Sequence, residues 1–137
     1  MSKMDTPEDQ DLSALILTDG KMGDLAQCRG VALALRANTS EIVVMPSPAA
    51  ALFKTMRADK QFHDQLAAMQ TAPNVVLASG RRALPYLKAV RAKWGDQTLT
   101  VFLKDPRTGA KTADLIWVPT HDKLRGDNVV VTDTSPH

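Results

Sequence analysis

The segment from residue 15 to residue 27, LILTDGKMGDLAQ, interrupts an apolar run with two glycines on either side of a lysine. Gly20 and Gly23 have no side chain that would hold a ligand away from the backbone, and Lys21 adds a positive charge. Asp19 directly precedes the first glycine. These residue types predict a loop that a phosphate can approach closely. The loop is neither a P-loop, which needs GxxxxGKS or GxxxxGKT, nor a dinucleotide fingerprint, which needs GxGxxG.

Asp24 and Gln27 have the spacing of a capping box, which predicts a helix that begins at Leu25. The first amides of that helix would face the glycine loop and, with the helix dipole, would favour an anion there. Two interpretations have about equal weight. In one the loop binds a phosphate; in the other the glycines only turn the chain and Gln27 only caps the helix.

A second segment, Ser79-Gly80-Arg81-Arg82, places two arginines at the start of another predicted helix. Pro85 is best tolerated among the first four helical positions, so this helix should begin near Arg81 or Arg82. The helix dipole disfavours cations there, and an arginine pair therefore suggests an anionic ligand or a partner carboxylate. In the alternative, one arginine pairs with a loop aspartate such as Asp105 and the other is solvated.

The remaining candidates are weaker. Pro106 and Arg107 lie in a third loop, and His121 beside Asp122 has the residue types of a proton shuttle, although a surface histidine is the more common case. Cys28 falls on the apolar face of the first helix and is predicted to be core. No cluster has the spacing of metal ligands, and we expect neither a metal nor a cofactor.

The elements that would position these residues alternate along the chain. Apolar runs predict strands, and apolar residues at helical spacing predict helices between them. The predicted strands are 12–18, 41–45, 74–78, 98–103, 114–118 and 129–132, and the predicted helices are 24–37, a segment opened by Pro46-Ser47-Pro48 with an apolar stripe from Leu52 to Met69, and 82–94.

This alternation predicts an α/β fold, a three-layer Rossmann-like domain with a five- or six-stranded, mainly parallel sheet. The first strand is fully apolar and both flanking loops are of the ligand-binding type, which predicts a central position in the sheet. Ligands of such sheets bind beyond the carboxyl ends of the strands. We therefore expect the loops after the first, third, fourth and fifth predicted strands to converge, with Lys21, Arg81 and Arg107 pointing into one cleft.

Composition limits the class of protein. The 137 residues fit one domain of ordinary size, 44% of them are hydrophobic, and the formal net charge is +2. That charge is too small to indicate a nucleic-acid partner. The single cysteine fits a reducing compartment, and no window has the length and hydropathy of a signal peptide or a spanning helix. These features predict a cytoplasmic protein, with residues 1–10 as a disordered tail.

Four stretches in this order resemble the mitochondrial fission Elm family: TDGKMGDLAQ, ASGRR, VFLKDPR, and DLIWVPTHDKLRGDNVVVTDTSPH. The resemblance covers nearly the whole chain beyond the tail. Family members are about twice this length and are grouped with GT-B glycosyltransferases, in which two Rossmann-like domains face a cleft. The resemblance therefore implies that residues 11–137 are the N-terminal domain, with the C-terminal domain missing from this chain.

The resemblance implies ligand-binding roles for a set of positions in the loops described above. These are Asp19, Gly20, Lys21, Gly23, Gln27, Ser79, Gly80, Arg81, Pro106, Arg107, His121 and Asp122. It further implies the acceptor side or diphosphate side of a glycosyltransferase-like or sugar-nucleotide-related protein. The expected partner is a sugar-nucleotide or a diphosphate-bearing small molecule or lipid.

Alone, the fragment is expected to be inactive, because GT-B enzymes hold the nucleotide-sugar mainly in the C-terminal domain. A different class follows from the family's name: a non-catalytic division factor or anion-binding module, peripheral to the inner membrane. Bacterial members are often labelled nucleoside-diphosphate-sugar epimerases. Short-chain epimerases need a tyrosine with a lysine four residues later, whereas here Tyr86 is followed at that distance by Val90.

Overall fold

A computed structural model describes residues 12–20, 22–44 and 60–133. The strands are β1 (Ser13–Thr18), β2 (Asn38–Val43), β3 (Val75–Ser79), β4 (Leu99–Leu103), β5 (Leu115–Pro119) and β6 (Val129–Thr132). The helices are α2 (Met22–Ala34), α4 (Lys60–Ala68) and α5 (Leu84–Trp94), with short 3-10 turns η1 (Arg81–Ala83), η2 (Gly95–Gln97) and η3 (Ala110–Thr112).

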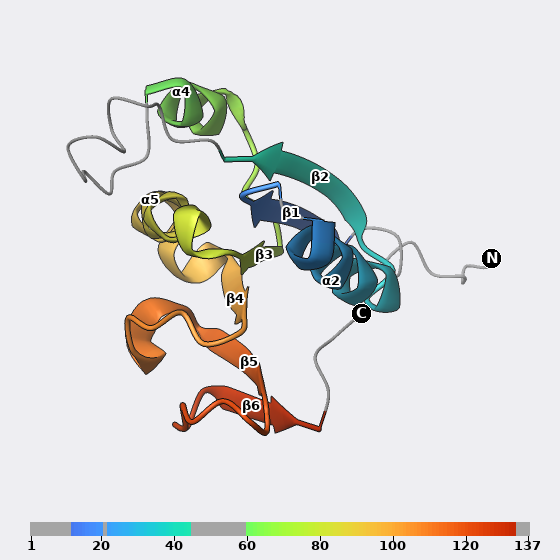
Figure 1. Cartoon of the computed structure of the whole chain (residues 1–137). Helices are drawn as coiled ribbons and strands as arrows, with labels where there is room; N and C mark the ends of the chain where they lie inside the picture. The colour runs from blue at the N-terminus through green and yellow to red at the C-terminus, as the bar shows by residue number, and fades with distance from the viewer. Residues whose placement is uncertain (1–11, 21, 45–59, 134–137) are drawn as a thin grey trace.

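All six strands form one parallel sheet in the order β2-β1-β3-β4-β5-β6 (Figure 1). The predicted α/β, three-layer Rossmann-like architecture is confirmed. The first strand, β1, is interior, with β2 on one side and β3 on the other. It is not central as predicted, because β2 alone lies on one side of it and four strands lie on the other.

The two faces of the sheet are covered by different helices. Leu25, Cys28 and Ala32 of α2 pack with alternate residues of β1, β3 and β4, among them Ile16 and Leu77. On the other face, residues of α4 and α5 pack against the strand side chains that point to that side, among them Leu15, Leu17 and Val76. The buried helix side chains there are Phe62, Leu66, Tyr86, Leu87, Val90 and Trp94. Because β1 and β3 are buried on both faces, they read as continuous apolar runs in the sequence.

The second strand differs most from its prediction. The predicted strand begins at residue 41, yet residues 38–40 pair with Ser13, Ala14 and Leu15 as the first half of β2. These polar residues are compatible with pairing because β2 is an edge strand whose side chains are largely exposed. Apolar periodicity detects burial, and an exposed edge strand has little burial to detect.

The first helix is displaced toward the N-terminus. It begins at Met22, three residues before the predicted start at Leu25, and ends at Ala34 instead of Ala37. Arg36 ends it in a left-handed conformation with φ of 56°. The amide of Ala37 donates to the carbonyl of Ala32, and that of Arg36 to Leu33, which is the hydrogen-bond pattern of a Schellman motif.

The third helix follows its prediction closely. The turn η1 begins at Arg81 and leads directly into α5, which has Pro85 in its first two positions. The predicted 3.6-residue stripe also holds: Leu87 and Val90 are fully buried, whereas Leu84 is half-buried. In the second predicted helix, Phe62 and Leu66 are buried as expected, and the segment opened by Pro46-Ser47-Pro48 lies outside the described residues.

Candidate functional site

The order of the strands places a topological switch point between β1 and β3. The chain passes from β1 to β2 on one side, and all later strands are added on the other side of β1. The carboxyl ends of β1 and β3 lie in register, with Thr18 opposite Ser79. In parallel sheets ligands bind outside the carboxyl ends of the strands at this point. The loops that follow Thr18 and Ser79 are the two that sequence analysis singled out.

These two loops touch through Asp19 and Gly80. A Cβ built on Gly80 would lie 2.8 Å from Oδ2 of Asp19 and 2.9 Å from its carboxyl carbon, so the carboxylate rests against the glycine backbone. Gly80 also has φ of 96°, a conformation that residues with side chains rarely adopt. The position therefore requires glycine for two separate reasons. The structure brings the Asp19 carboxylate and Gly80 into contact.

The glycine loop leaves β1 in a defined turn. Gly20 has φ of 88°, and its amide donates to the hydroxyl of Thr18 at 3.3 Å. A Cβ on Gly20 would lie 3.2 Å from a methyl group of Val43, at the end of β2. Gly23 lies in the first turn of α2, and a Cβ added there meets nothing within 4 Å. Lys21 lies outside the described residues.

Ser79 has a structural role instead of a place in the ligand-facing loop. It is the last residue of β3, fully buried, and its hydroxyl donates to the carbonyl of Leu103 at 3.3 Å. Its side chain therefore ties β3 to the neighbouring strand β4. The Ser79 hydroxyl therefore already has a partner inside the protein.

Both arginines of the second loop lie on the surface. Arg81 and Arg82 form the exposed turn η1 directly after Gly80. Among the described residues neither makes an ion pair, and the suggested partner, Asp105, accepts instead from the amide of Arg107. The anionic-ligand interpretation of the pair is therefore still open, while the pairing with Asp105 is not observed.

Asp24 and Gln27 do not form the predicted capping box. Because α2 begins at Met22, both residues lie inside the helix. Asp24 is buried and its Oδ1 accepts from Nζ of Lys104 at 2.5 Å. The Oε1 of Gln27 is buried with no hydrogen-bond partner in the part of the chain that the structure describes. The Asp24 carboxylate therefore binds the side chain of Lys104, in the loop after β4, instead of capping the first amides of α2.

Lys104 is the site residue that sequence reasoning missed. It follows β4 with φ of 95°, and its amide donates to the carbonyl of Trp117. Its ammonium group joins the loop after β4 to α2, across eighty residues of sequence. No local pattern in the sequence connects Lys104 to Asp24.

The third loop, which follows β4, contains Pro106 and Arg107. Pro106 is buried, so its side chain supports the fold. Arg107 is exposed, with φ of 61°, and its amide donates to Oδ1 of Asp105 at 2.8 Å. The carboxylate thus closes a local turn that Arg107 ends. Convergence of this loop with the Asp19 and Gly80 contact is a prediction that the described contacts leave untested.

His121 and Asp122 follow β5 and are not hydrogen-bonded to each other. Nε2 of His121 is 3.6 Å from Oδ1 of Asp122, which is too long for a hydrogen bond, and the histidine side chain is 79% exposed. Both backbone groups of Asp122 are hydrogen-bonded: its amide donates to the carbonyl of Pro119, and its carbonyl accepts from Nη1 of Arg125. In this arrangement the aspartate does not orient the imidazole as a proton shuttle requires.

Two side chains with reactive groups are core. Cys28 is fully buried between α2 and the sheet; burial, and then the charge of Asp24, raise the pKa of its thiol to about 12. A thiol with this pKa is neutral at physiological pH and is not a nucleophile. Tyr86 is buried against the ring of Phe62, with centroids 4.8 Å apart. The prediction that Cys28 belongs to the core is confirmed.

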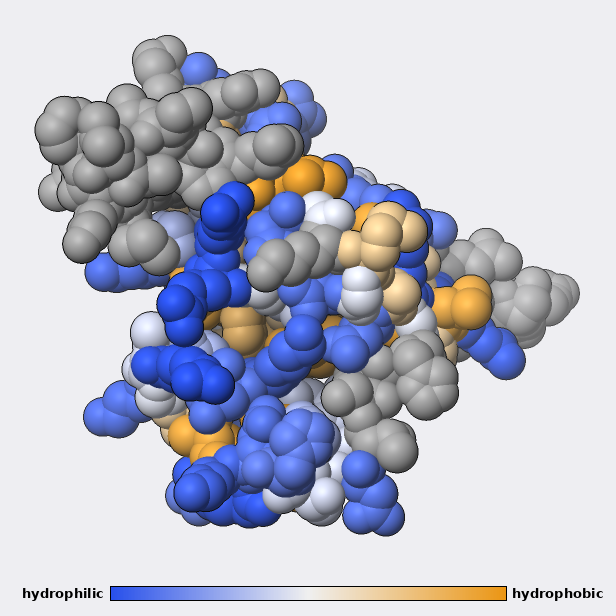
Figure 2. Space-filling model, in the orientation of Figure 1, coloured by the Kyte–Doolittle hydropathy of each residue, from blue (hydrophilic) through white to orange (hydrophobic). Residues whose placement is uncertain are grey.

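The described residues contain neither a cluster of metal-ligand side chains nor a membrane-spanning helix. No group of three or more His, Cys, Asp or Glu side chains gathers as metal ligands do. None of the described helices has the length and hydropathy needed to cross a bilayer. Figure 2 shows a mainly hydrophilic surface on the visible side, with hydrophobic residues in separate places.

Comparison with known proteins identifies the family. The family model described as mitochondrial fission ELM1 matches residues 22–137, which include the second, third and fourth loops of the candidate site but not Asp19 and Gly20. Neither the curated proteins nor the solved structures contain a significant match. The family model spans most of the chain and agrees with the resemblance of the loop motifs. The chain belongs to the mitochondrial fission ELM1 family.

Proposed function

We propose that this chain is the acceptor-side or diphosphate-side domain of a glycosyltransferase-like protein that uses a sugar-nucleotide or a related diphosphate. The observation that carries the proposal is the contact of the Asp19 and Gly80 loops at the switch point between β1 and β3. The grouping of the family with GT-B glycosyltransferases supplies the reaction class.

The residue types at this edge suit the two halves of such a ligand. A carboxylate accepts hydrogen bonds from hydroxyl groups, so Asp19 fits a hydroxyl of the sugar that the diphosphate carries. Guanidinium groups bind phosphate oxygens in a bidentate manner, so Arg81 and Arg82 fit the diphosphate. Gly20 is exposed and has no side chain, so a phosphate can approach its backbone. The site therefore combines hydroxyl recognition with anion recognition over a short segment of the sheet edge.

Binding by this domain alone should be weak. Each charge-assisted hydrogen bond contributes about 1.5 to 3 kcal/mol, and ordering of the exposed arginines and of the ligand opposes it. A dissociation constant of roughly high micromolar to millimolar follows. We do not expect the isolated domain to catalyse sugar transfer, because a GT-B site needs the facing domain.

Calorimetric titration with a nucleoside diphosphate and with the corresponding nucleoside-diphosphate sugar tests this proposal. Replacing Arg81 and Arg82 together by Gln should weaken both ligands about tenfold, because the phosphate contacts are lost. Asp19→Asn should weaken the sugar nucleotide more than the diphosphate. The double variant Arg36→Gln/Lys93→Gln removes the same charge at the ends of α2 and α5 and should change neither affinity by more than about twofold.

Two results would contradict the proposal. If the Arg81 and Arg82 variant binds as the unmodified chain does, the phosphate lies elsewhere. If the unmodified chain binds neither ligand at millimolar concentration, the alternative gains: a non-catalytic division factor that acts through protein or membrane contacts.

A further inference from the structure

The connection between β4 and β5 leaves one side of α5 open. β3 reaches β4 through the full helix α5, whereas β4 and β5 are joined by a loop that contains only the short turn η3. Parallel strands are usually joined by a helix, and such a helix would pack beside α5. A pocket of about 490 Å³ occupies this place, a size typical of small-molecule sites. It is lined by Leu84, Pro85, Lys88, Arg91, Thr108, Lys111 and Thr112.

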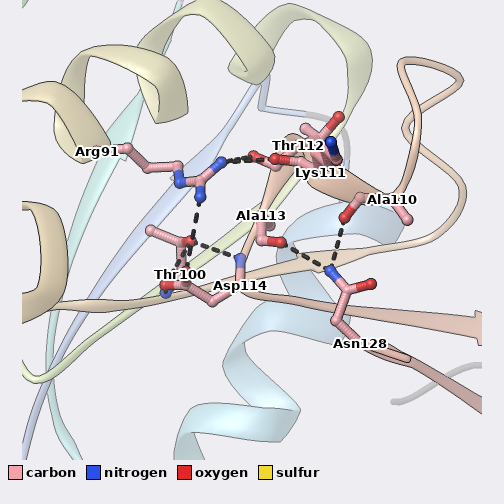
Figure 3. Close-up of polar contacts among 8 residues, drawn as sticks. All are labelled: Arg91, Thr100, Ala110, Lys111, Thr112, Ala113, Asp114 and Asn128. Carbon is pink, nitrogen blue, oxygen red and sulfur yellow. Dashed lines mark hydrogen bonds and ion pairs between the residues drawn. The ribbon is translucent and has the colours of Figure 1, made fainter. Parts of the chain in front are cut away.

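Polar contacts hold the turn η3, which forms the wall of this pocket opposite α5 (Figure 3). Nη1 of Arg91 donates to the carbonyls of Lys111 at 2.7 Å and of Thr112 at 3.0 Å. From the other side, Nδ2 of Asn128 donates to the carbonyls of Ala110 at 2.6 Å and of Ala113 at 3.0 Å. The turn η3 is thus fixed by side chains from α5 and from the residue before β6. A wall fixed in this way loses little conformational freedom when a ligand binds.

The charge of the lining is one-sided. It includes three cations and no carboxylate. Asp114 lies nearby, with Oδ1 3.6 Å from Nη2 of Arg91, and its Oδ2 accepts from the amide and the hydroxyl of Thr100. Arg91 is therefore already engaged. Lys88 and Lys111 are exposed, and neither forms an ion pair with any residue that the structure describes.

Neutral groups complete the pocket. The hydroxyls of Thr108 and Thr112 are 2.5 Å apart and share one hydrogen bond, which leaves further acceptor positions and one hydroxyl hydrogen for a ligand. Leu84 and Pro85, in the first turn of α5, provide apolar surface. Two cations, two hydroxyls and an apolar wall together fit a molecule with an anionic end and an apolar end.

We propose that this pocket binds a phosphate monoester with an apolar or aromatic group. The phosphate lies between Lys88 and Lys111 and contacts the threonine hydroxyls, and the apolar group lies against Leu84 and Pro85. The proposal does not rest on the function proposed above. Its residues are distinct from Asp19, Gly80 and the two arginines after Gly80.

Amide NMR titration of the 137-residue chain with phenyl phosphate tests this site, with inorganic phosphate and phenol as the separate halves of the probe. The largest shifts are expected at residues 84–91 and 108–112. Phenyl phosphate should bind at least about threefold more tightly than inorganic phosphate, because only the ester contacts the apolar wall. Affinity should fall as salt concentration rises, because the two ammonium groups are exposed.

The variant Lys88→Gln/Lys111→Gln should weaken phenyl phosphate about tenfold, whereas the charge-matched variant Lys93→Gln/Lys123→Gln should change its affinity less than twofold. Circular dichroism before each titration establishes that both variants are folded. Equal loss in the two variants, shifts confined to other parts of the chain, or equal affinity for phenyl phosphate and inorganic phosphate would each overturn the proposal.

Discussion

At the scale of single residues, Gly80 is the position with the least freedom to change. A Cβ at this position would lie 2.8 Å from the carboxylate of Asp19. The new residue would also have to keep a backbone with φ of 96°. Positive φ in a residue with a side chain costs of order 1–3 kcal/mol, and displacement of Asp19 adds to it. Gly80→Ala should therefore lower the free energy of unfolding, measured by urea denaturation, by at least about 2 kcal/mol.

Gly23→Ala is the matched control, because its Cβ meets nothing and its position is helical. It should be neutral or should stabilise the protein by up to about 1 kcal/mol. Adding Asp19→Ala to Gly80→Ala should recover the part of the loss caused by the carboxylate, and not the part caused by φ. A Gly80→Ala protein as stable as the unmodified one would show that the Asp19 and Gly80 contact is absent in solution.

Burial of the Cys28 thiol makes the stability of the folded protein depend on pH. Its pKa in the folded protein, about 12, is above the value of about 8.5 in an unfolded chain. The neutral thiol therefore contributes stability that is fully present below pH 8.5 and is lost as pH rises toward 12. At pH 8 the folded protein should react with iodoacetamide only as fast as it unfolds, whereas in denaturant the reaction should be complete within minutes. Rapid modification of the folded chain would contradict its buried position.

At the scale of elements, the end of α2 offers a stabilising substitution. Arg36 adopts φ of 56° in the Schellman motif, a position that glycine occupies without strain. Arg36→Gly should raise the free energy of unfolding by about 0.5 to 1 kcal/mol, because αL strain is removed. Arg36→Ala, which removes the same side chain and keeps the strain, should bring no such gain. If both variants are equally stable, the gain does not come from the backbone.

Most elements were predictable because their signals are local. Strands β1 and β3 are buried on both faces and read as apolar runs, and Pro85 places the start of α5 within a turn. The errors have equally definite causes. The start of edge strand β2 was missed because it consists of polar residues. The capping box was predicted wrongly because Asp24 pairs with Lys104 instead of capping α2.

At the scale of the whole molecule, the contact of Asp24 with Lys104 connects the first helix to the loop after β4. The Asp24 side chain is 6% exposed, and that of Lys104 is 48% exposed. Lys104→Met would leave a buried carboxylate without its cation and should cost about 2 to 4 kcal/mol by urea denaturation, discounted for the exposed ammonium.

Asp24→Asn in the Lys104→Met background should restore part of this stability, because the remaining amide is neutral. A double-mutant cycle measures the coupling directly. Additive effects of the two substitutions would show that the pair contributes little to folding.

The candidate site was predictable at the level of loops, and less so at the level of side chains. Parallel strands bring their carboxyl ends to one edge, so Asp19 and Gly80 follow from the topology. The inward hydroxyl of Ser79, the buried ring of Pro106 and the contact of Lys104 depend on packing between distant segments. No local pattern in the sequence carries that information.

The central claim is that a diphosphate ligand binds at the carboxyl ends of β1 and β3, and amide NMR titration with a nucleoside diphosphate tests it most directly. The largest and saturable shifts should occur at Gly20, Gly80, Arg81 and Arg82, and their saturation should need about tenfold more ligand in the Arg81→Gln/Arg82→Gln variant. Shifts of equal size at the opposite edge of the sheet, at Ala37 and Asn74, would contradict it, as would saturable binding confined to the pocket beside α5.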